Sequence, residues 1–166
     1  MYSIIAGTNR SDSNSLKIAN IYREILLKNG VESGVFSLEE LDLNSKSSSF
    51  LTFQERTLIP SNKFIFVLPE YNGSYPGVFK TLIDLSDIKT CWPGKKALLV
   101  GVATGRGGNI RGLDHITGVL NYINVIVHPN KLPISSLDNM MSSEGKLTDP
   151  KMISSVENQV REFVNF

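Results

Sequence analysis

The sequence predicts a single α/β domain in which helices connect five parallel strands. Three observations support this prediction: short apolar runs alternate with longer amphipathic stretches, Gly or Pro stands at the joints between them, and 166 residues suffice for one compact domain. No internal repeat or charge block divides the chain, so residues 1–166 are expected to form one unit. Right-handed crossovers give a doubly wound sheet, which binds ligands at the carboxyl ends of its strands.

The expected strands are apolar on both faces, as strands between two helical layers must be. In chain order they are Ser3–Ala6, Gly34–Phe36, Phe64–Leu68, Ala97–Val102 and Asn124–Val127. Residues 128–148 are rich in Pro, Ser and Asn. They are expected to form a long connection, with room for a small edge strand at Lys131–Ile134.

Helical periodicity fills the segments between the strands. The first helix is expected from about Ser13 to Asn29, because apolar side chains gather on one face and Gly30 can end it. The next begins at Pro76, a residue suited to the first helical turn, and a further apolar stripe runs from Leu113 to Leu120. The last helix begins at Asp149–Pro150, an N-cap followed by proline. A weaker pattern over residues 51–59 predicts a short helix after a polar loop.

Composition limits the possible functions. The 17 Lys and Arg against 16 Asp and Glu give a net charge of +1, which supplies no field for nucleic acid or membrane binding. Cys91 stands alone, and with His115 and His128 it makes too few ligands for a structural metal site. The amino terminus lacks the basic segment of a signal peptide, and no apolar run approaches the ~20 residues that span a bilayer. We therefore expect a cytoplasmic protein.

The first loop at the predicted carboxyl edge, residues 7–15, is a candidate phosphate site. A helix N-terminus offers free N–H groups and a partial positive charge, and here hydroxyls and the Arg10 guanidinium surround it. The hydroxyls belong to Thr8, Ser11, Ser13 and Ser15. The loop has neither a Walker lysine nor a nucleophilic cysteine, and Asp12 is expected to point into solvent. The alternative is an ordinary turn that caps a helix.

Two further loops follow the third and fourth strands. Residues 69–77 carry Pro and Gly at both ends, which favours a tight backbone turn. The N–H and C=O groups exposed there could contact a planar heterocycle. Residues 103–109 carry glycines at 105, 107 and 108 that permit close approach of a ligand, but their spacing is not that of a dinucleotide-binding fingerprint. The alternative for residues 69–77 is a turn that only starts the next helix. The alternative for residues 103–109 is a plain flexible connection.

Taken together, the three loops resemble those of the NAD(P)H-dependent FMN reductases, flavodoxin-like proteins that include azo-dye, quinone and chromate reductases. The resemblance spans nearly the whole chain. Its most distinctive part is Pro69-Glu70-Tyr71-Asn72-Gly73-Ser74, and Gly7-Thr8-x-Arg10-x-x-Ser13 and Thr104-Gly105-Arg106-Gly107-Gly108 support it. It implies a three-layer flavodoxin-like fold with strand order 2-1-3-4-5.

The resemblance also implies roles for single residues. Thr8, Arg10, Ser13 and Ser15 would hold the FMN phosphate. The isoalloxazine would be edged by Pro69, Glu70, Tyr71, Asn72 and Gly73, and its pyrimidine side would be closed by Thr104, Gly105, Gly107 and Gly108. The implied reaction takes hydride from NADPH or NADH onto flavin N5 and passes electrons to a small-molecule acceptor. A flavin edge in a shallow cleft would be poorly shielded, and the apolar helices after Pro76 and Gly108 would flank that cleft, so we also expect a homodimer or homotetramer.

Two other functions stay open from the sequence. A flavodoxin-type electron carrier would have no substrate turnover of its own, although such carriers are usually strongly acidic and this chain is not. A binding module without cofactor would not need all three loops. No side chain is expected to act as a catalytic acid, base or nucleophile, and His115, His128 and Cys91 are expected to be structural or solvent-facing.

Overall fold

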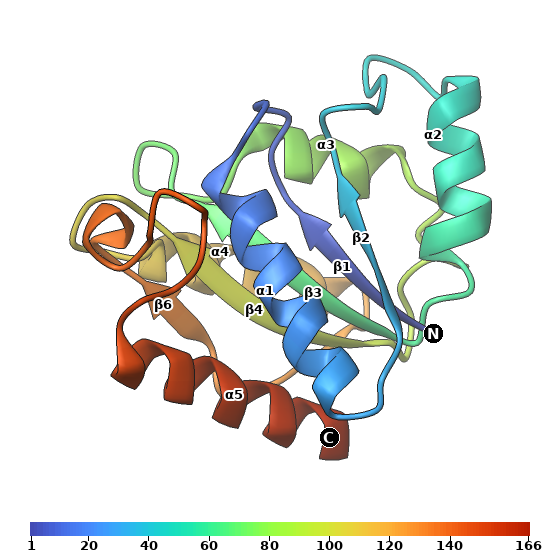
Figure 1. The fold of residues 1–166 in the computed structure, drawn as a ribbon. Coiled ribbons are helices and arrows are strands. Elements are labelled where there is room, and N and C mark those ends of the chain that lie inside the picture. The colour runs from blue at the N-terminus through green and yellow to red at the C-terminus, as the bar shows by residue number, and fades with distance from the viewer.

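A parallel sheet runs through the middle of the molecule (Figure 1). In the computed structural model, which describes residues 1–166, the strands are β1 (Tyr2–Ala6), β2 (Ser33–Ser37), β3 (Lys63–Pro69), β4 (Lys96–Val102), β5 (Ile126–Val127) and β6 (Leu132–Ile134). Their order is β2-β1-β3-β4-β5, β6 also pairs with β4, and all pairs are parallel. The doubly wound sheet of order 2-1-3-4-5 is therefore confirmed.

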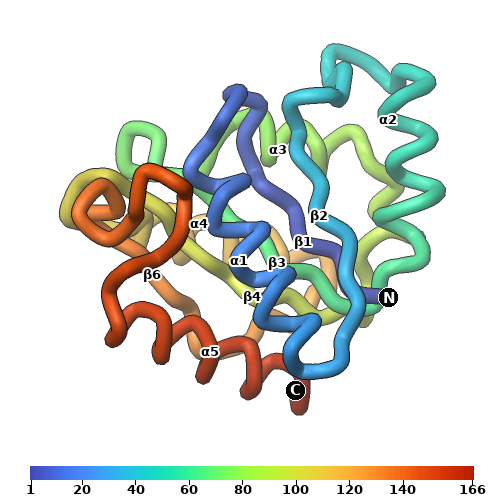
Figure 2. The backbone as a smooth tube through the Cα atoms, viewed as in Figure 1, coloured from blue at the N-terminus to red at the C-terminus, as the bar shows by residue number.

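Helices cover both faces of this sheet (Figures 1 and 2). One apolar layer belongs to α1 (Asn14–Lys28) and α5 (Pro150–Asn165), and the other to α2 (Ser48–Phe53), α3 (Gly77–Leu85) and α4 (Ile110–Tyr122). Neighbouring strand residues point to opposite layers, so Ile4 packs with the first and Ile5 with the second. Burial on both faces explains why the strands read as unbroken apolar runs.

The helix boundaries follow the capping signals in the sequence. The Ser13 hydroxyl accepts a hydrogen bond from the Leu16 N–H at 3.2 Å, and the Asp149 carboxylate accepts one from the Met152 N–H at 2.7 Å. Gly30, just beyond α1, has a φ of +76°, which suits a residue without a side chain. The weak helical pattern becomes α2 followed by a π-helical turn over Gln54–Leu58. No helix is both long and apolar enough to cross a membrane.

At the edge of the sheet beside β4, the strand expected over Asn124–Val127 is shorter than predicted. Asn124 has a left-handed φ of +61°, so β5 begins only at Ile126. Pro129 then interrupts the edge strand, because proline has no N–H to donate to the hydrogen-bond ladder of the sheet. The edge continues as β6, which pairs with Val100–Val102 of β4. The small edge strand expected within residues 131–134 is thus confirmed.

Gln159 of α5 bridges this interruption. Its buried amide donates from Nε2 to the carbonyl oxygens of Asn130 at 2.8 Å and Leu99 at 3.3 Å. The Tyr22 hydroxyl of α1 donates to its Oε1 at 2.5 Å. One buried amide therefore joins both helices of this layer to the broken edge.

Replacing Tyr22 by Phe is expected to lower the free energy of unfolding by about 1–2 kcal/mol, because Gln159 Oε1 stays buried without its donor. Denaturant unfolding measures this change. Tyr2→Phe is the matched control, since the Tyr2 side chain is only half-buried and lies at the start of β1. Equal losses in the two variants would contradict the role of the buried bond.

Wild-type protein and Tyr22→Phe also test how the free energy of unfolding depends on pH. Burial raises the pKa of Tyr22 well above its ordinary value of 10.0, so the unfolded chain releases this proton at a lower pH than the folded one. The resulting stability is fully present below pH 10.0 and is lost as the pH rises through the folded pKa. Wild-type protein should therefore lose unfolding free energy above this pH more steeply than Tyr22→Phe. Identical slopes would show that Tyr22 does not contribute.

Candidate functional site

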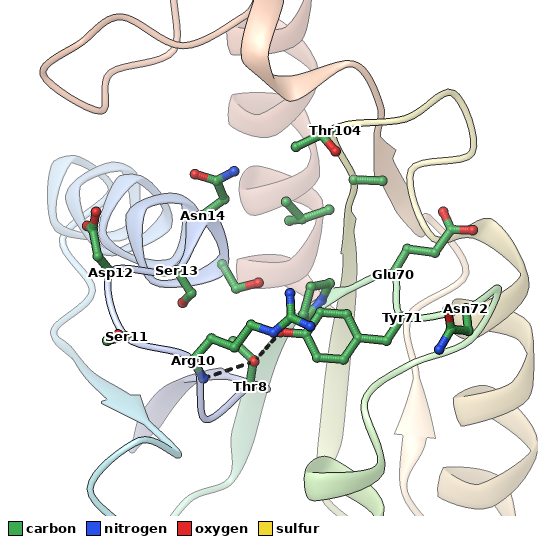
Figure 3. A pocket seen from close by; sticks show the side chains of 14 residues that line it. Thr8, Arg10, Ser11, Asp12, Ser13, Asn14, Glu70, Tyr71, Asn72 and Thr104 are labelled. Atoms are coloured by element: carbon green, nitrogen blue, oxygen red, sulfur yellow. Dashed lines mark hydrogen bonds between the residues drawn. The ribbon is translucent and has the colours of Figure 1, made fainter.

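A polar cavity of about 420 Å³ lies where three loops meet at the carboxyl ends of β1, β3 and β4. Figure 3 shows the side chains around it, with the loop before α1 on one side, Glu70 and Tyr71 on the other and Thr104 above. Its lining consists of Thr8, Arg10, Ser11, Asp12, Ser13, Asn14, Ser15, Pro69, Glu70, Tyr71, Asn72, Val102, Ala103 and Thr104. Parallel strands place these loops at one edge of the sheet, so residues distant in sequence share one cavity.

The N-terminus of α1 forms the most polar wall. Asn14 and Ser15 are its first residues, so their backbone N–H groups have no acceptor within the helix. Ser15 is 1% exposed, and its Oγ has no hydrogen-bond partner. Buried hydroxyls are rarely left unpaired. The wall therefore offers a free hydroxyl together with the partial positive charge of a helix end.

A contact between Arg10 and Tyr71 links the first and second loops. The Tyr71 hydroxyl lies 2.6 Å from Thr8 Oγ1, and the Arg10 guanidinium carbon lies 4.2 Å from the centre of the Tyr71 ring. The Thr8 hydroxyl is buried and also accepts from the Arg10 backbone N–H at 3.3 Å. No carboxylate forms an ion pair with Arg10. Its positive charge is thus available to an anion at this wall.

The second loop contains a tight turn. The N–H of Tyr71 donates to the Ser74 carbonyl at 2.9 Å, and the N–H of Ser74 donates back at 3.2 Å. Asn72 and Gly73 between them have φ values of +53° and +79°, which Asn-Gly adopts readily. The turn therefore fixes the direction in which the Tyr71 ring leaves the loop.

The third loop packs closely on its surroundings. A Cβ on Gly107 would lie 3.0 Å from a carboxylate oxygen of Glu70, and one on Gly108 would lie 2.8 Å from the Pro133 backbone. Gly108 also has a φ of +55°. Both glycines thus have a packing reason in addition to the ligand contact expected of them.

The cavity brings together most residues expected at the site. These are Thr8, Arg10, Ser13, Ser15, Pro69, Glu70, Tyr71, Asn72 and Thr104. Gly73, Gly105, Gly107 and Gly108 lie in the same loops but outside the lining, and their contact with a ligand stays a prediction. Among the lining residues not proposed as site residues are Ser11, Asn14, Val102 and Ala103. Asn14 could have been found, because it lies between Ser13 and Ser15, both of which the sequence assigns to the phosphate loop.

Asp12 points into solvent, and neither histidine nor Cys91 lines the cavity. Asp12 is 87% exposed in its side chain and pairs with Lys17 at 3.2 Å, as its expected solvent orientation requires. His128 is buried against the Phe166 ring, and burial raises the pKa of the Cys91 thiol. His115 lies outside the lining, with Nδ1 3.0 Å from the Ser74 hydroxyl. The cavity wall therefore holds no histidine or cysteine.

Known proteins with similar sequences include FMN reductases and quinone reductases. The sequence profile of the NADPH-dependent FMN reductases matches residues 3–138. An NAD(P)H-dependent FMN reductase of Pseudomonas aeruginosa is 33% identical over 106 residues, covering 61% of this chain and 56% of that protein. A 2-hydroxy-1,4-benzoquinone reductase of a Burkholderia species is 24% identical over 132 residues, covering 75% and 72%. The match thus spans little more than half of the Pseudomonas protein.

Solved structures support the fold. The flavoenzyme NAD(P)H:(acceptor) oxidoreductase FerB of Paracoccus denitrificans superposes with a TM-score of 0.85 at 22% identity, covering 99% of this chain and 94% of that chain. A flavodoxin from the domain Archaea gives 0.66 at 11% identity, covering 99% and 97%. At these identities the similarity shows a flavodoxin-like fold. Because the family profile covers most of the chain, the protein belongs to the NADPH-dependent FMN reductase family.

Proposed function

We propose that this protein is a cytoplasmic flavoprotein oxidoreductase that binds FMN non-covalently in the cavity and uses NADPH or NADH to reduce a small-molecule acceptor. The unpaired Ser15 hydroxyl at the N-terminus of α1 carries this proposal most directly. A buried polar group without a partner is unfavourable by about 1–3 kcal/mol, which an acceptor oxygen of a ligand would relieve. A phosphate supplies such oxygens together with negative charge.

The residues present fit FMN. Ser15, the first N–H groups of α1 and Arg10 would hold the phosphate, with Ser13 and Thr8 beside them. Residues 69–73 and 104–108 would flank the ring system with backbone groups. The hydroxyl and N–H donors of this wall suit one terminal phosphate, so FMN is expected to bind in preference to FAD.

The protein's part in the reaction is binding and alignment. When bound, FMN supplies a ring that accepts hydride at N5 from a reduced nicotinamide and later yields electrons to the acceptor. The turn at residues 70–73 and the loop at residues 105–108 would orient the ring and offer N–H groups to negative charge. Both substrates would reach the same open face near Tyr71 and Asn72. Ping-pong kinetics are therefore expected.

A visible spectrum of the purified protein tests this proposal. Protein loaded with FMN should lose the yellow absorption band when NADPH or NADH is added without oxygen, and a quinone should restore it. Loaded protein that neither donor reduces would contradict the proposed reaction.

An electron carrier remains the second candidate, because the molecule superposes well on a flavodoxin. The net charge of +1 speaks against it, since a carrier steers onto its partners by strong charge. A carrier would bind FMN but show no steady-state turnover of NADPH or NADH with quinones. The same spectral experiment, extended to turnover, separates the two functions.

His115→Ala and Cys91→Ser should each leave the rate of flavin reduction within about tenfold of wild type, less than the loss of a true acid–base group. Neither side chain lines the cavity. Stopped-flow reduction by NADPH measures the rates. A near-complete loss of reduction in either variant, with FMN still bound, would overturn the proposal that alignment alone suffices.

The proposal includes a homodimer or homotetramer. An apolar groove of about 670 Å³ lies between α3 and α4 and is lined by Ile83, Ile88, Val119, Tyr122 and Ile123 among others. Ile88 is 47% exposed and Tyr122 83%, so a second copy could bury both. Light scattering at micromolar concentration should give at least twice the monomer mass. A monomer with FMN and activity intact would remove this part of the proposal.

A further inference from the structure

Asn109, the N-cap residue of α4, connects the two loops that flank the cavity. Its side chain is fully buried, and Nδ2 donates to the carbonyl oxygens of Leu68 and Pro69, both at 3.0 Å. Its backbone N–H donates to Glu70 Oε2 at 3.0 Å. A single residue of the third loop thus holds three consecutive residues at the end of β3.

Few residue types could make these contacts. Asn109 has a left-handed φ of +63°, a conformation that asparagine tolerates better than most side chains. Its short amide also supplies two donors, which reach the buried Leu68 carbonyl and the part-buried Pro69 carbonyl. Without them the carbonyl oxygens of Leu68 and Pro69 would lose these partners inside the protein, which is unfavourable.

Two glycines make room for this arrangement. A Cβ on Gly101 of β4 would lie 2.0 Å from the Gly108 carbonyl oxygen, and one on Gly112 of α4 would lie 2.0 Å from Asn109 Oδ1. Such distances are far shorter than any non-bonded contact. The backbone before α4 therefore sits directly against β4, and Asn109 sits directly against its own helix.

We propose that Asn109 is a positioning residue that fixes the Pro69–Glu70 segment relative to the third loop. Asn109 does not line the cavity, whereas Pro69, Glu70 and Thr104 do, so it acts through them. The inference rests on the proposed function, because the spacing of these two loops matters for a planar ring held between them. It predicts that Asn109 governs affinity for the ring system and leaves the phosphate contribution unchanged.

Asn109→Gly removes the amide but keeps the backbone N–H and the left-handed conformation. Asn124→Gly is the matched control, because Asn124 also has a left-handed φ, +61°, and is exposed beyond the other end of α4. Titrations with riboflavin and with FMN should show both ligands weakened about tenfold in Asn109→Gly and unchanged in Asn124→Gly. The ratio of the two dissociation constants should stay at its wild-type value.

A merely structural role would lower thermal stability without changing riboflavin affinity of the folded protein. A riboflavin dissociation constant within twofold of wild type would therefore overturn the proposal. If Asn109→Gly does not fold, Asn109→Ser serves instead, since it is uncharged and keeps at most one of the two donors, and it should weaken both flavins by the same factor.

Hydrogen exchange of the ligand-free protein separates this inference from the proposed function. In Asn109→Gly, amide exchange should become faster in residues 69–74 and 103–109 and stay unchanged at β1. This readout needs no flavin, so it holds even if the wild-type protein binds none. Unchanged exchange in both loops would overturn the positioning role, whereas changed exchange without flavin binding would overturn only the proposed function.

Discussion

Arg10→Ala is expected to weaken FMN binding about ten- to hundredfold, the range for losing a hydrogen bond to a charged group. Arg10 has no carboxylate partner, and its guanidinium rests on the Tyr71 ring at the wall formed by α1. A phosphate at that wall would give the cation an anionic partner that the protein alone does not provide. The fold should be unaffected, because the Arg10 side chain is exposed.

Titration with FMN and riboflavin measures this effect. Riboflavin lacks the phosphate, so its affinity should be the same in Arg10→Ala and wild type. Arg23→Ala is the matched control, since Arg23 is an exposed arginine within α1, away from the cavity. A change in FMN affinity below twofold would mean that backbone N–H groups and hydroxyls alone hold the anion.

Gly101→Ala is expected to lower the free energy of unfolding by about 3 kcal/mol, the upper part of the range for overpacking a filled interior. The new Cβ would lie 2.0 Å from the Gly108 carbonyl oxygen. A backbone oxygen cannot rotate away as a side chain can, so β4 or the third loop must move. Because Asn109 follows Gly108, the movement should also weaken riboflavin binding.

Denaturant unfolding and riboflavin titration of Gly101→Ala check both effects. Gly77→Ala, at the start of α3, is the control because a Cβ there meets nothing within 4 Å. Its stability should stay within about 0.5 kcal/mol of wild type. Gly101→Ala with wild-type stability would mean that the close approach of β4 and the third loop is not required.

Local signals in the sequence were sufficient for most of the fold. Strands buried on both faces produce unbroken apolar runs, and the caps Ser13 and Asp149 mark helix starts that the structure confirms. The polar wall at the N-terminus of α1 was predictable for the same reason. Its hydroxyls and Arg10 all belong to one short segment that joins a strand to a helix.

Contacts between distant segments were not predictable in this way. The role of Asn109 depends on carbonyl groups about forty residues earlier, and nothing next to it in sequence indicates them. Gln159 likewise bridges the interrupted sheet edge from α5, by hydrogen bonds to the carbonyl groups of Leu99 and Asn130. The sequence did predict two strands at that edge, but not that the left-handed Asn124 would delay the start of β5 to Ile126.

The central claim is that the wall formed by Ser15, Arg10 and the N-terminus of α1 binds the phosphate of FMN. Calorimetric titration of the ligand-free protein with FMN, riboflavin and FAD tests it most directly. We expect FMN to bind at least about tenfold more tightly than riboflavin, because only FMN engages the charged and unpaired groups of that wall. FAD should bind more weakly than FMN. Equal affinities for FMN and riboflavin would contradict the assignment of this wall as a phosphate site.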